Sequence, residues 1–320
     1  MLNRRHIRIK VLQALYAAIQ SDDTDIITGQ KQLMQKLDKI YDLTIYQLSV
    51  LLEVRDYSEQ RIEDAKKKNL PTPEDLNPNT RFIENVFLLQ LQENIDYKKR
   101  ADKLAINWVN EPEMIRKIYS NLLESDFYQE YMSAGQVNYK NEKEFVQRFF
   151  NDIVIPHESL HSLFAEKNIH WADDYNLSSE VSLMIISAYK AGWSENKILP
   201  PLFKDDGELT ESQDRAFAKQ LFKEVLQNKE KYEELMKPKI KNWEMDRLAT
   251  IDKILIKMAL AEVLEMPTIP VKVSLNEYIE LSKYFSTPKS KVFINGILDN
   301  VVADLKTKGE INKQGRGLMN

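Results

Sequence analysis

Three of the four histidines lie within fourteen residues of one another, in a pattern that could hold a metal ion. His157, Glu158 and His161 belong to the sequence His-Glu-Ser-Leu-His. In such a motif two histidines four residues apart share a helix face, and the glutamate between them activates a zinc-bound water. His170 or Glu180 could supply a third ligand. A zinc hydrolase is therefore one hypothesis for this chain.

The surrounding residues favour ordinary histidines over a metal site. The extended metzincin motif needs a glycine where the chain has Phe164 and a histidine where it has Lys167. The chain has no cysteine, so it can form no disulfide and has no thiolate for catalysis or metal binding. We expect no metal and no cofactor, and the zinc hydrolase is kept as a remote alternative.

A second group of residues could bind a polyanion. Arg4, Arg5, Arg8 and Lys10 all precede the first acidic residue, Asp22, in a chain whose formal net charge is −4. A concentrated cationic end on an acidic chain suggests a phosphate-rich partner, and the planar guanidinium group matches phosphate well. These four residues are therefore candidate RNA-binding residues.

Composition excludes several classes of protein. The chain has 320 residues, of which 43% are hydrophobic and only 8 are glycine. Scarce glycine argues against sandwiches, propellers and phosphate-binding glycine loops. No run approaches the ~18 apolar residues of a membrane span. The apolar run 14–19 is shorter than the core of a secretory signal, usually about 7–15 residues. We expect a soluble, cytoplasmic protein of about two domains.

Helical spacing of apolar residues predicts an all-α protein. Helices are expected over 33–51, 81–94, 112–123, 142–152 and 178–191, and in a final block from Phe217 onward. Proline-containing segments at 66–80 and 199–207 separate these blocks. Ser274 and Glu277 match a capping box, which predicts a helix start at Ser274. Asn295-Gly296 is expected inside a helix, where glycine would allow a second backbone to pass close by.

Two stretches carry a more specific pattern. The first is Arg4-Arg5-His6-Ile7-Arg8 followed by Gln13-Ala14-Leu15-Tyr16, and the second comprises segments 242–248, 251–259, 270–283 and 290–299. Together they resemble the NusB family of transcription antitermination factors, over residues 1–20 and 213–306. The resemblance implies a NusB-like helical bundle of two packed helical subdomains, interrupted by a large all-helical insertion.

The resemblance also divides the chain. Residues 1–21 would form the basic helix of the NusB-like core, and residues 22–212 a helical insertion or expanded N-terminal subdomain. Residues 213–306 would form the C-terminal helical domain, and residues 307–320 a flexible tail.

The function implied by the family is RNA binding without catalysis. NusB proteins hold the single-stranded boxA element of nascent ribosomal RNA together with the ribosomal protein NusE, in the RNA polymerase antitermination complex. The residues implied for RNA binding are Arg4, Arg5, Arg8, Lys10, Tyr16, Lys289, Ser290 and Phe293. The residues implied for partner binding are Asp246 and Asp252. Tyr16 and Phe293 could instead be core aromatics, and Asp246 an ordinary acid near a helix start.

Two positions depart from the family pattern and leave the RNA affinity open. Lys289 stands where the family commonly has an acid, and Val292 stands where it commonly has a basic residue. Lys289 and Lys291 could replace the missing charge. The alternative function is a protein-interaction or ribosome-assembly factor without RNA binding, whose working surface is the insertion.

Overall fold

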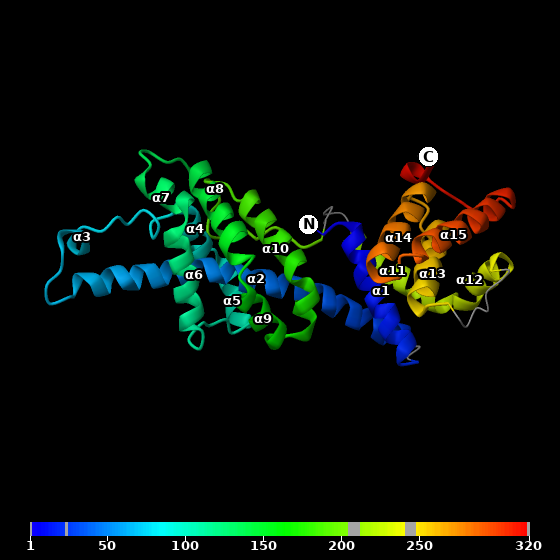
Figure 1. The fold of residues 1–320 in the computed structure, drawn as a ribbon. Helices are drawn as coiled ribbons and strands as arrows, with labels where there is room; N and C mark the ends of the chain where they lie inside the picture. The colour runs from blue at the N-terminus through cyan, green and yellow to red at the C-terminus, as the bar shows by residue number, and fades with distance from the viewer. Residues whose placement is uncertain (1, 23–24, 204–211, 241–247, 319–320) are drawn as a thin grey trace. The chain divides into compact units, whose positions relative to one another are not determined.

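The computed structural model describes residues 2–22, 25–203, 212–240 and 248–318, and these ranges are built from helices (Figure 1). The expected all-α fold is confirmed, because these ranges contain fifteen α-helices and no strand. None of the helices in these ranges is long and apolar enough to cross a membrane.

The α-helices are α1 (Arg4–Gln20), α2 (Ile26–Lys66), α3 (Pro73–Leu76), α4 (Val86–Glu93), α5 (Ile95–Lys103), α6 (Pro112–Glu124), α7 (Asp126–Ser133), α8 (Tyr139–Phe149), α9 (Glu158–Lys167), α10 (Ile169–Ala188), α11 (Gln213–Gln227), α12 (Lys229–Met236), α13 (Thr250–Glu265), α14 (Val271–Phe285) and α15 (Ser290–Thr307). Shorter turns are a π-helix η1 (Phe150–Val154) and two 3₁₀-helices, η2 (Lys237–Lys239) and η4 (Gly315–Leu318).

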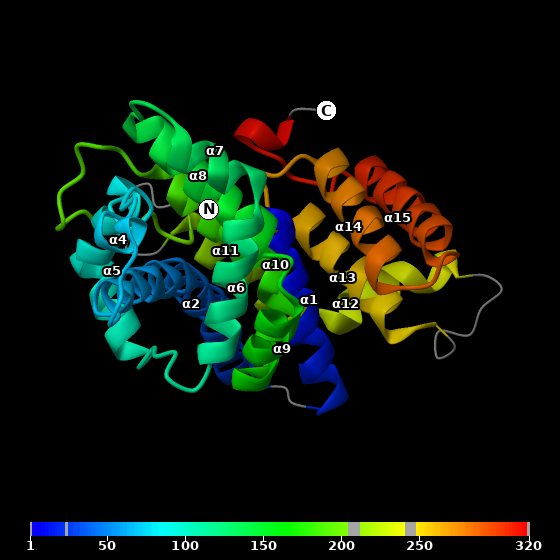
Figure 2. The same cartoon turned by 60° about the vertical axis from the view of Figure 1, so that its left-hand side comes forward.

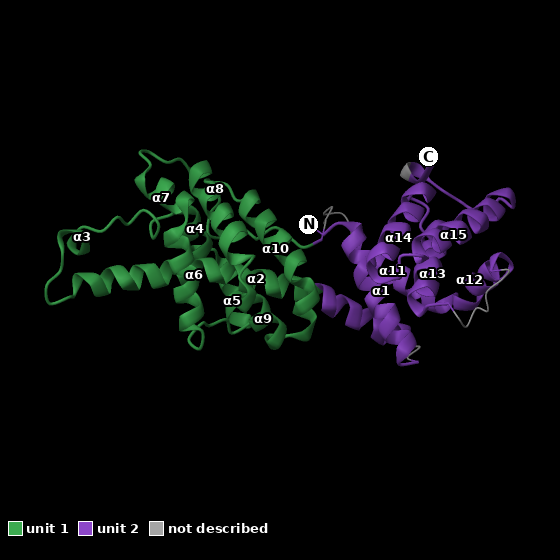
Figure 3. Ribbon diagram, in the orientation of Figure 1, with its two compact units in different colours: residues 1, 38–202 green, residues 2–37, 203–320 purple. Residues whose placement is uncertain are grey.

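The described residues fall into two compact units (Figure 3). Unit 1 holds residues 38–202, and unit 2 holds residues 2–37 and 203–320. Helix α2 belongs to unit 2 up to Leu37 and to unit 1 from Asp38 onward. All of unit 1 lies within segment 22–212, which the sequence suggests as an insertion.

The core of unit 1 is rich in aromatic side chains. One cluster comprises Phe82, Tyr128, Tyr131, Phe145 and Phe149. A second surrounds the fully buried Phe164 with the rings of Tyr46, Trp108, Trp171 and Tyr175. Aromatic pairs at such spacings add to the stability gained by burying their area.

Helices α2 and α10 of unit 1 meet through small polar side chains. Gln47 donates to Ser179 at 2.9 Å and accepts from Ser182 at 3.0 Å, and all three residues are buried. Small serines allow the two backbones to approach closely, and their hydroxyls satisfy the buried amide. This contact explains why α10 carries a polar stripe inside a core.

Helix α13 is the centre of unit 2. All residues from Ile254 to Val263 are buried, which agrees with a helix that is covered on every side. Helices α1, α11, α12, α14 and α15 contact it (Figures 1 and 2). The basic helix α1 is thereby held against the C-terminal helices that share its sequence signature.

Two local predictions have different outcomes. The helix over Asn295-Gly296 is confirmed, because α15 runs through both residues. However, apart from the neighbouring residues and backbone of α15 itself, no described atom lies within 4 Å of the position that a Cβ on Gly296 would take, so the expected close backbone is not there. The predicted helix start at Ser274 is wrong, because α14 begins at Val271, after Pro270. Ser274 makes a tertiary hydrogen bond instead of capping the helix.

Candidate nucleic-acid interface

The arginines of the N-terminal cluster lie in the first turns of α1. The Asn3 side chain caps this helix by accepting a hydrogen bond from the His6 amide at 3.0 Å. Cations are unfavourable at a helix N-terminus because of the helix dipole. Acids from other helices of unit 2 offset this cost, and each of Arg4, Arg5 and Arg8 has its own carboxylate partner.

Arg8 is a core residue. Its side chain is 3% exposed, and its Nε and Nη2 donate to the two carboxylate oxygens of Glu262 at 2.8 and 2.6 Å. The hydroxyls of Ser274 and Tyr278 donate to the same carboxylate. Burial acts to lower the pKa of Arg8, but the hydrogen bonds and charge of Glu262 outweigh it, so the pKa is raised. The pair fixes α1 against α13.

Arg8 and Lys10, which the sequence suggests as RNA contacts, are thus both buried in unit 2, and their contacts with RNA stay a prediction. Lys10 is 5% exposed and is one of the buried residues of α1. A phosphate cannot replace Glu262 as the partner of Arg8 without opening the core. The acid-free sequence around Arg8 indicated a cation but could not show that Glu262 meets it in the fold.

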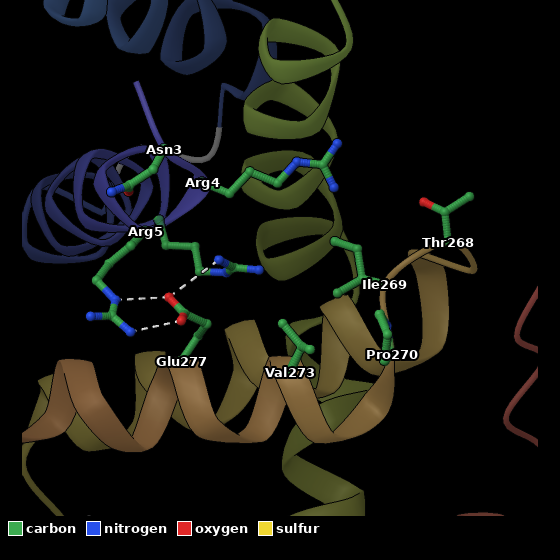
Figure 4. A pocket seen from close by; sticks show the side chains of 9 residues that line it. Asn3, Arg4, Arg5, Thr268, Ile269, Pro270, Val273 and Glu277 are labelled. Carbon is green, nitrogen blue, oxygen red and sulfur yellow. Dashed lines mark hydrogen bonds and ion pairs between the residues drawn. The ribbon is translucent and has the colours of Figure 1, made fainter. Parts of the chain in front are cut away.

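Arg4 and Arg5 remain accessible and line a pocket of 540 Å³ (Figure 4). The Arg5 side chain is 43% exposed and donates from Nη2 and Nε to Glu277 at 2.8 and 3.0 Å. The Arg4 side chain is 36% exposed, 3.4 Å from Asp214, and its guanidinium lies over the Phe217 ring. The rest of the lining includes Ile269, Pro270 and Val273, so the pocket joins apolar walls to two accessible cations.

Ser290 and Asp252 are structural residues. Ser290 is 3% exposed, and its hydroxyl donates to Asp252 Oδ2 at 2.8 Å, while Ser286 donates to Oδ1 at 2.5 Å. Asp252 is 6% exposed and thereby ties the start of α13 to the start of α15. The contacts expected of Ser290 with RNA and of Asp252 with a partner protein stay predictions, and in the structure both side chains bond inside unit 2. Asp246, the other expected partner contact, lies outside the described residues.

The surface beside Ser290 carries the accessible groups. Lys289 and Lys291 are exposed, and no described carboxylate lies within ion-pair distance of either. Phe293 is half-buried, and Tyr16 on α1 is 41% exposed. Tyr16 and Phe293 thus differ in their access to a ligand, although the sequence could not separate them.

Glu280 shows that α1 and the start of α15 contribute to one surface. Its pKa is lowered first by a hydrogen bond from Lys283, and then by the charges of Lys283, Arg5 and Lys291. The pKa of Arg5 is raised mainly by its hydrogen bond to Glu277, with contributions from Glu280 and Tyr284. We call Arg5, Lys283, Tyr284, Lys289 and Lys291 the cationic face. Cations combined with aromatic side chains are the groups with which proteins bind single-stranded nucleic acids.

We compared the chain with models of protein families and with known proteins. The NusB family model matches residues 194–303. The transcription antitermination protein NusB of Salinibacter ruber is 44% identical over 105 residues, which are 33% of this chain and 66% of that protein. The same-named protein of Bacillus licheniformis is 45% identical over 91 residues, 28% of this chain and 70% of the relative.

This chain belongs to the NusB family. A third relative, the transcription antitermination protein NusB of Chloroherpeton thalassium, is 35% identical over 141 residues, 44% of this chain and 66% of that protein. The chain thus spans about two thirds of the length of these curated relatives. The α1–α13 pairing and the cationic face all lie in unit 2, the unit that contains most of the NusB family match.

The sequence analysis did not single out Lys283, at the end of the signature segment 270–283, or Tyr284, the residue after it, as site residues. Helical spacing does indicate on which side of α14 they lie. The buried stripe of α14 comprises Ser274, Tyr278 and Leu281, at steps of four and three. The next residue of that stripe is Phe285, at a step of four, which leaves Tyr284 on the side of the helix. Tyr284 as a whole is accordingly 75% exposed.

The His-Glu-Ser-Leu-His motif lies in unit 1, outside the residues 194–303 that the family model matches. His157 is the N-cap of α9 and is 7% exposed, with no hydrogen-bond partner for either ring nitrogen among the described residues. His161 packs edge-on against Tyr175 at 4.8 Å. In the ranges that the structure describes, no three histidine, aspartate or glutamate side chains are grouped as metal ligands.

Proposed function

We propose that this chain is a transcription antitermination factor that binds single-stranded, boxA-type RNA through unit 2. Membership of the NusB family supports the general role. The observation that carries the RNA assignment is Glu280, whose pKa is lowered mainly by a hydrogen bond from Lys283 and further by the charges of Arg5 and Lys291. Cations almost 300 residues apart in the chain therefore contribute to one accessible surface of unit 2.

The cationic face acts by binding, without covalent chemistry. Arg5 presents a planar guanidinium that Glu277 holds in place, and Lys289 and Lys291 extend the positive surface along the start of α15. These groups track the phosphates of the strand. Arg8 contributes indirectly, because its bond to Glu262 fixes the helix that carries Arg4 and Arg5.

The proposed protein partner is the NusE-type ribosomal protein, within an RNA polymerase antitermination complex. Asp246 stays the proposed contact for this partner. Tyr16 and Phe293 are proposed to flank the RNA path, with Arg4 at the edge of the pocket that Arg5 also lines. Asp252 supports this surface from inside by holding the start of α15.

Fluorescence anisotropy with a labelled boxA-type RNA tests the proposal, with and without the NusE-type protein. Four phosphate contacts, by Arg5, Lys283, Lys289 and Lys291, predict a slope of about −2.8 in a plot of log affinity against log salt. A fourfold rise in salt should then weaken binding roughly fiftyfold. Absence of salt-sensitive binding under both conditions would reject the RNA assignment.

A further inference from the structure

We propose that Tyr284 is a base-stacking residue, and that the ligand it recognises is an unpaired base of single-stranded RNA. The inference rests on the proposed function, because it adds a specific base contact to a surface that otherwise binds phosphates.

The ring of Tyr284 is available in a way that other tyrosines of unit 2 are not. Tyr232 and Tyr278 are fully buried, and Tyr16 is 41% exposed, whereas Tyr284 is 75% exposed. Tyr284 lies one residue before the end of α14, on the side of that helix that also carries Glu277 and Glu280. Burial in the core therefore does not explain an aromatic residue at this position.

The charges around Tyr284 favour a nucleic acid over other ligands. Tyr284 contributes to the raised pKa of Arg5, after the hydrogen bond and charge of Glu277 and the charge of Glu280. Lys283 is its neighbour in sequence, and Lys291 acts on the adjacent Glu280. A base that stacks on a ring carries a phosphate on either side, so cations flanking the ring suit this ligand.

The ligand must be single-stranded. In duplex RNA the faces of the bases are stacked on one another, and a protein reaches only their edges and the backbone. A ring projecting from the end of a helix can stack only on a base that has been splayed out. Tyr284 therefore adds selectivity for unpaired RNA, whereas the neighbouring cations would accept any polyphosphate.

The test compares full-length wild-type protein with Tyr284→Ala, Tyr284→Phe and Tyr284→Trp variants, by anisotropy with one RNA sequence in single-stranded and duplex form. Tyr284→Ala should weaken single-strand binding roughly tenfold to a hundredfold, and Tyr284→Phe by no more than about twofold. The salt slope should stay the same, because no phosphate contact is lost. Binding of the single strand should quench the fluorescence of the tryptophan that Tyr284→Trp introduces. Val292→Ala, at another 75% exposed side chain of unit 2, is the matched control and should bind normally.

The possible failures are distinguishable. If wild-type protein binds no RNA at any salt concentration, the proposed function fails and the stacking role with it. If wild-type protein binds and Tyr284→Ala binds equally well, only the stacking role is overturned. Equal losses in the alanine and phenylalanine variants would also overturn stacking, because they would indicate a hydroxyl contact. If Tyr284→Ala binds RNA normally but binds the NusE-type protein less well, the stacking role is overturned and Tyr284 is a protein contact. Far-UV circular dichroism checks that each variant is folded.

Discussion

The two units differ in both core chemistry and charge. Aromatic clusters fill unit 1, as around Phe164, whereas the centre of unit 2 holds a buried ion pair, Arg8 with Glu262. Residues 38–202 contain 19 lysines and arginines against 27 acids, but residues 2–37 and 203–320 contain 26 against 22. The overall charge of −4 therefore hides a basic unit and an acidic one. A polyanion should bind unit 2, and an RNA role is not expected of unit 1.

The largest expected effect comes from removing the acid of the buried pair. Glu262→Ala removes the bidentate partner of the buried Arg8 and leaves it only the 3.5 Å contact with Glu277, which should lower the free energy of unfolding by about 3–5 kcal/mol. Three of the four tryptophans, Trp108, Trp171 and Trp193, lie in unit 1. In urea unfolding, far-UV circular dichroism should thus show an early transition that tryptophan fluorescence largely misses.

A double substitution is the control for this comparison. Arg8→Met with Glu262→Leu removes both charges and should recover much of the lost stability, because well-packed apolar groups can replace a buried pair. Recovery should be incomplete, since the hydroxyls of Ser274 and Tyr278 lose their acceptor. A normal far-UV transition in Glu262→Ala would show that the pair does not stabilise unit 2.

A smaller effect is expected at the junction of α13 and α15. Asp252→Ala removes the acceptor of both Ser286 and Ser290 and should cost about 1.5–3 kcal/mol of unfolding free energy, as for hydrogen bonds to a charged group. Ser286→Ala, which removes one of the two bonds, should cost less. If Asp252→Ala instead leaves stability unchanged and weakens binding of the NusE-type protein, Asp252 is a partner contact after all.

Much of the fold followed from the sequence, but the roles of the site residues did not. Helical periodicity is local, so α6 and α15 could be predicted from a few turns of sequence. Whether an arginine is paired depends on acids that are distant in the chain, and Arg8 is 254 residues from Glu262. The capping-box pattern at Ser274 failed for the same reason, because its hydroxyl serves Glu262.

Acid should affect the two units in different pH ranges. Burial and, secondarily, the charge of Lys117 lower the pKa of His157 in unit 1 from its ordinary 6.5. The unfolded chain therefore takes up this proton first, and the stability contributed by neutral His157 declines as pH falls below about 6.5. Glu277 in unit 2 has a pKa lowered from 4.5, mainly by its bond from Arg5, so its contribution is complete above 4.5 and is lost as pH falls through the lowered value.

Tryptophan-monitored urea unfolding at pH 7.5, 6 and 5 measures the contribution of His157. His157→Leu should remove part of the decline in stability over this range. An identical pH dependence in wild type and His157→Leu would mean that this histidine does not titrate in a buried, neutral form.

The smallest expected effect is a gain in stability. Gly296 lies inside α15 with space for a Cβ, so Gly296→Ala should raise the free energy of unfolding by about 0.4–1 kcal/mol. The gain should appear in the far-UV transition assigned to unit 2. A loss of stability would show that Gly296 is more closely packed than the structure indicates.

Matched charge reversal in the two units tests whether RNA binds to the cationic face of unit 2. One variant combines Lys283→Glu, Lys289→Glu and Lys291→Glu on the cationic face of unit 2. The other combines Lys98→Glu, Lys99→Glu and Lys103→Glu, three exposed lysines of α5 in unit 1. Both change the net charge equally, and anisotropy against boxA-type RNA is measured over a range of salt concentrations. The unit 2 variant should bind weakly, with a slope reduced from about −2.8 to about −0.7, and the unit 1 variant should keep the wild-type slope. Equal losses in both variants, or a loss confined to the unit 1 variant, would contradict RNA binding by the cationic face.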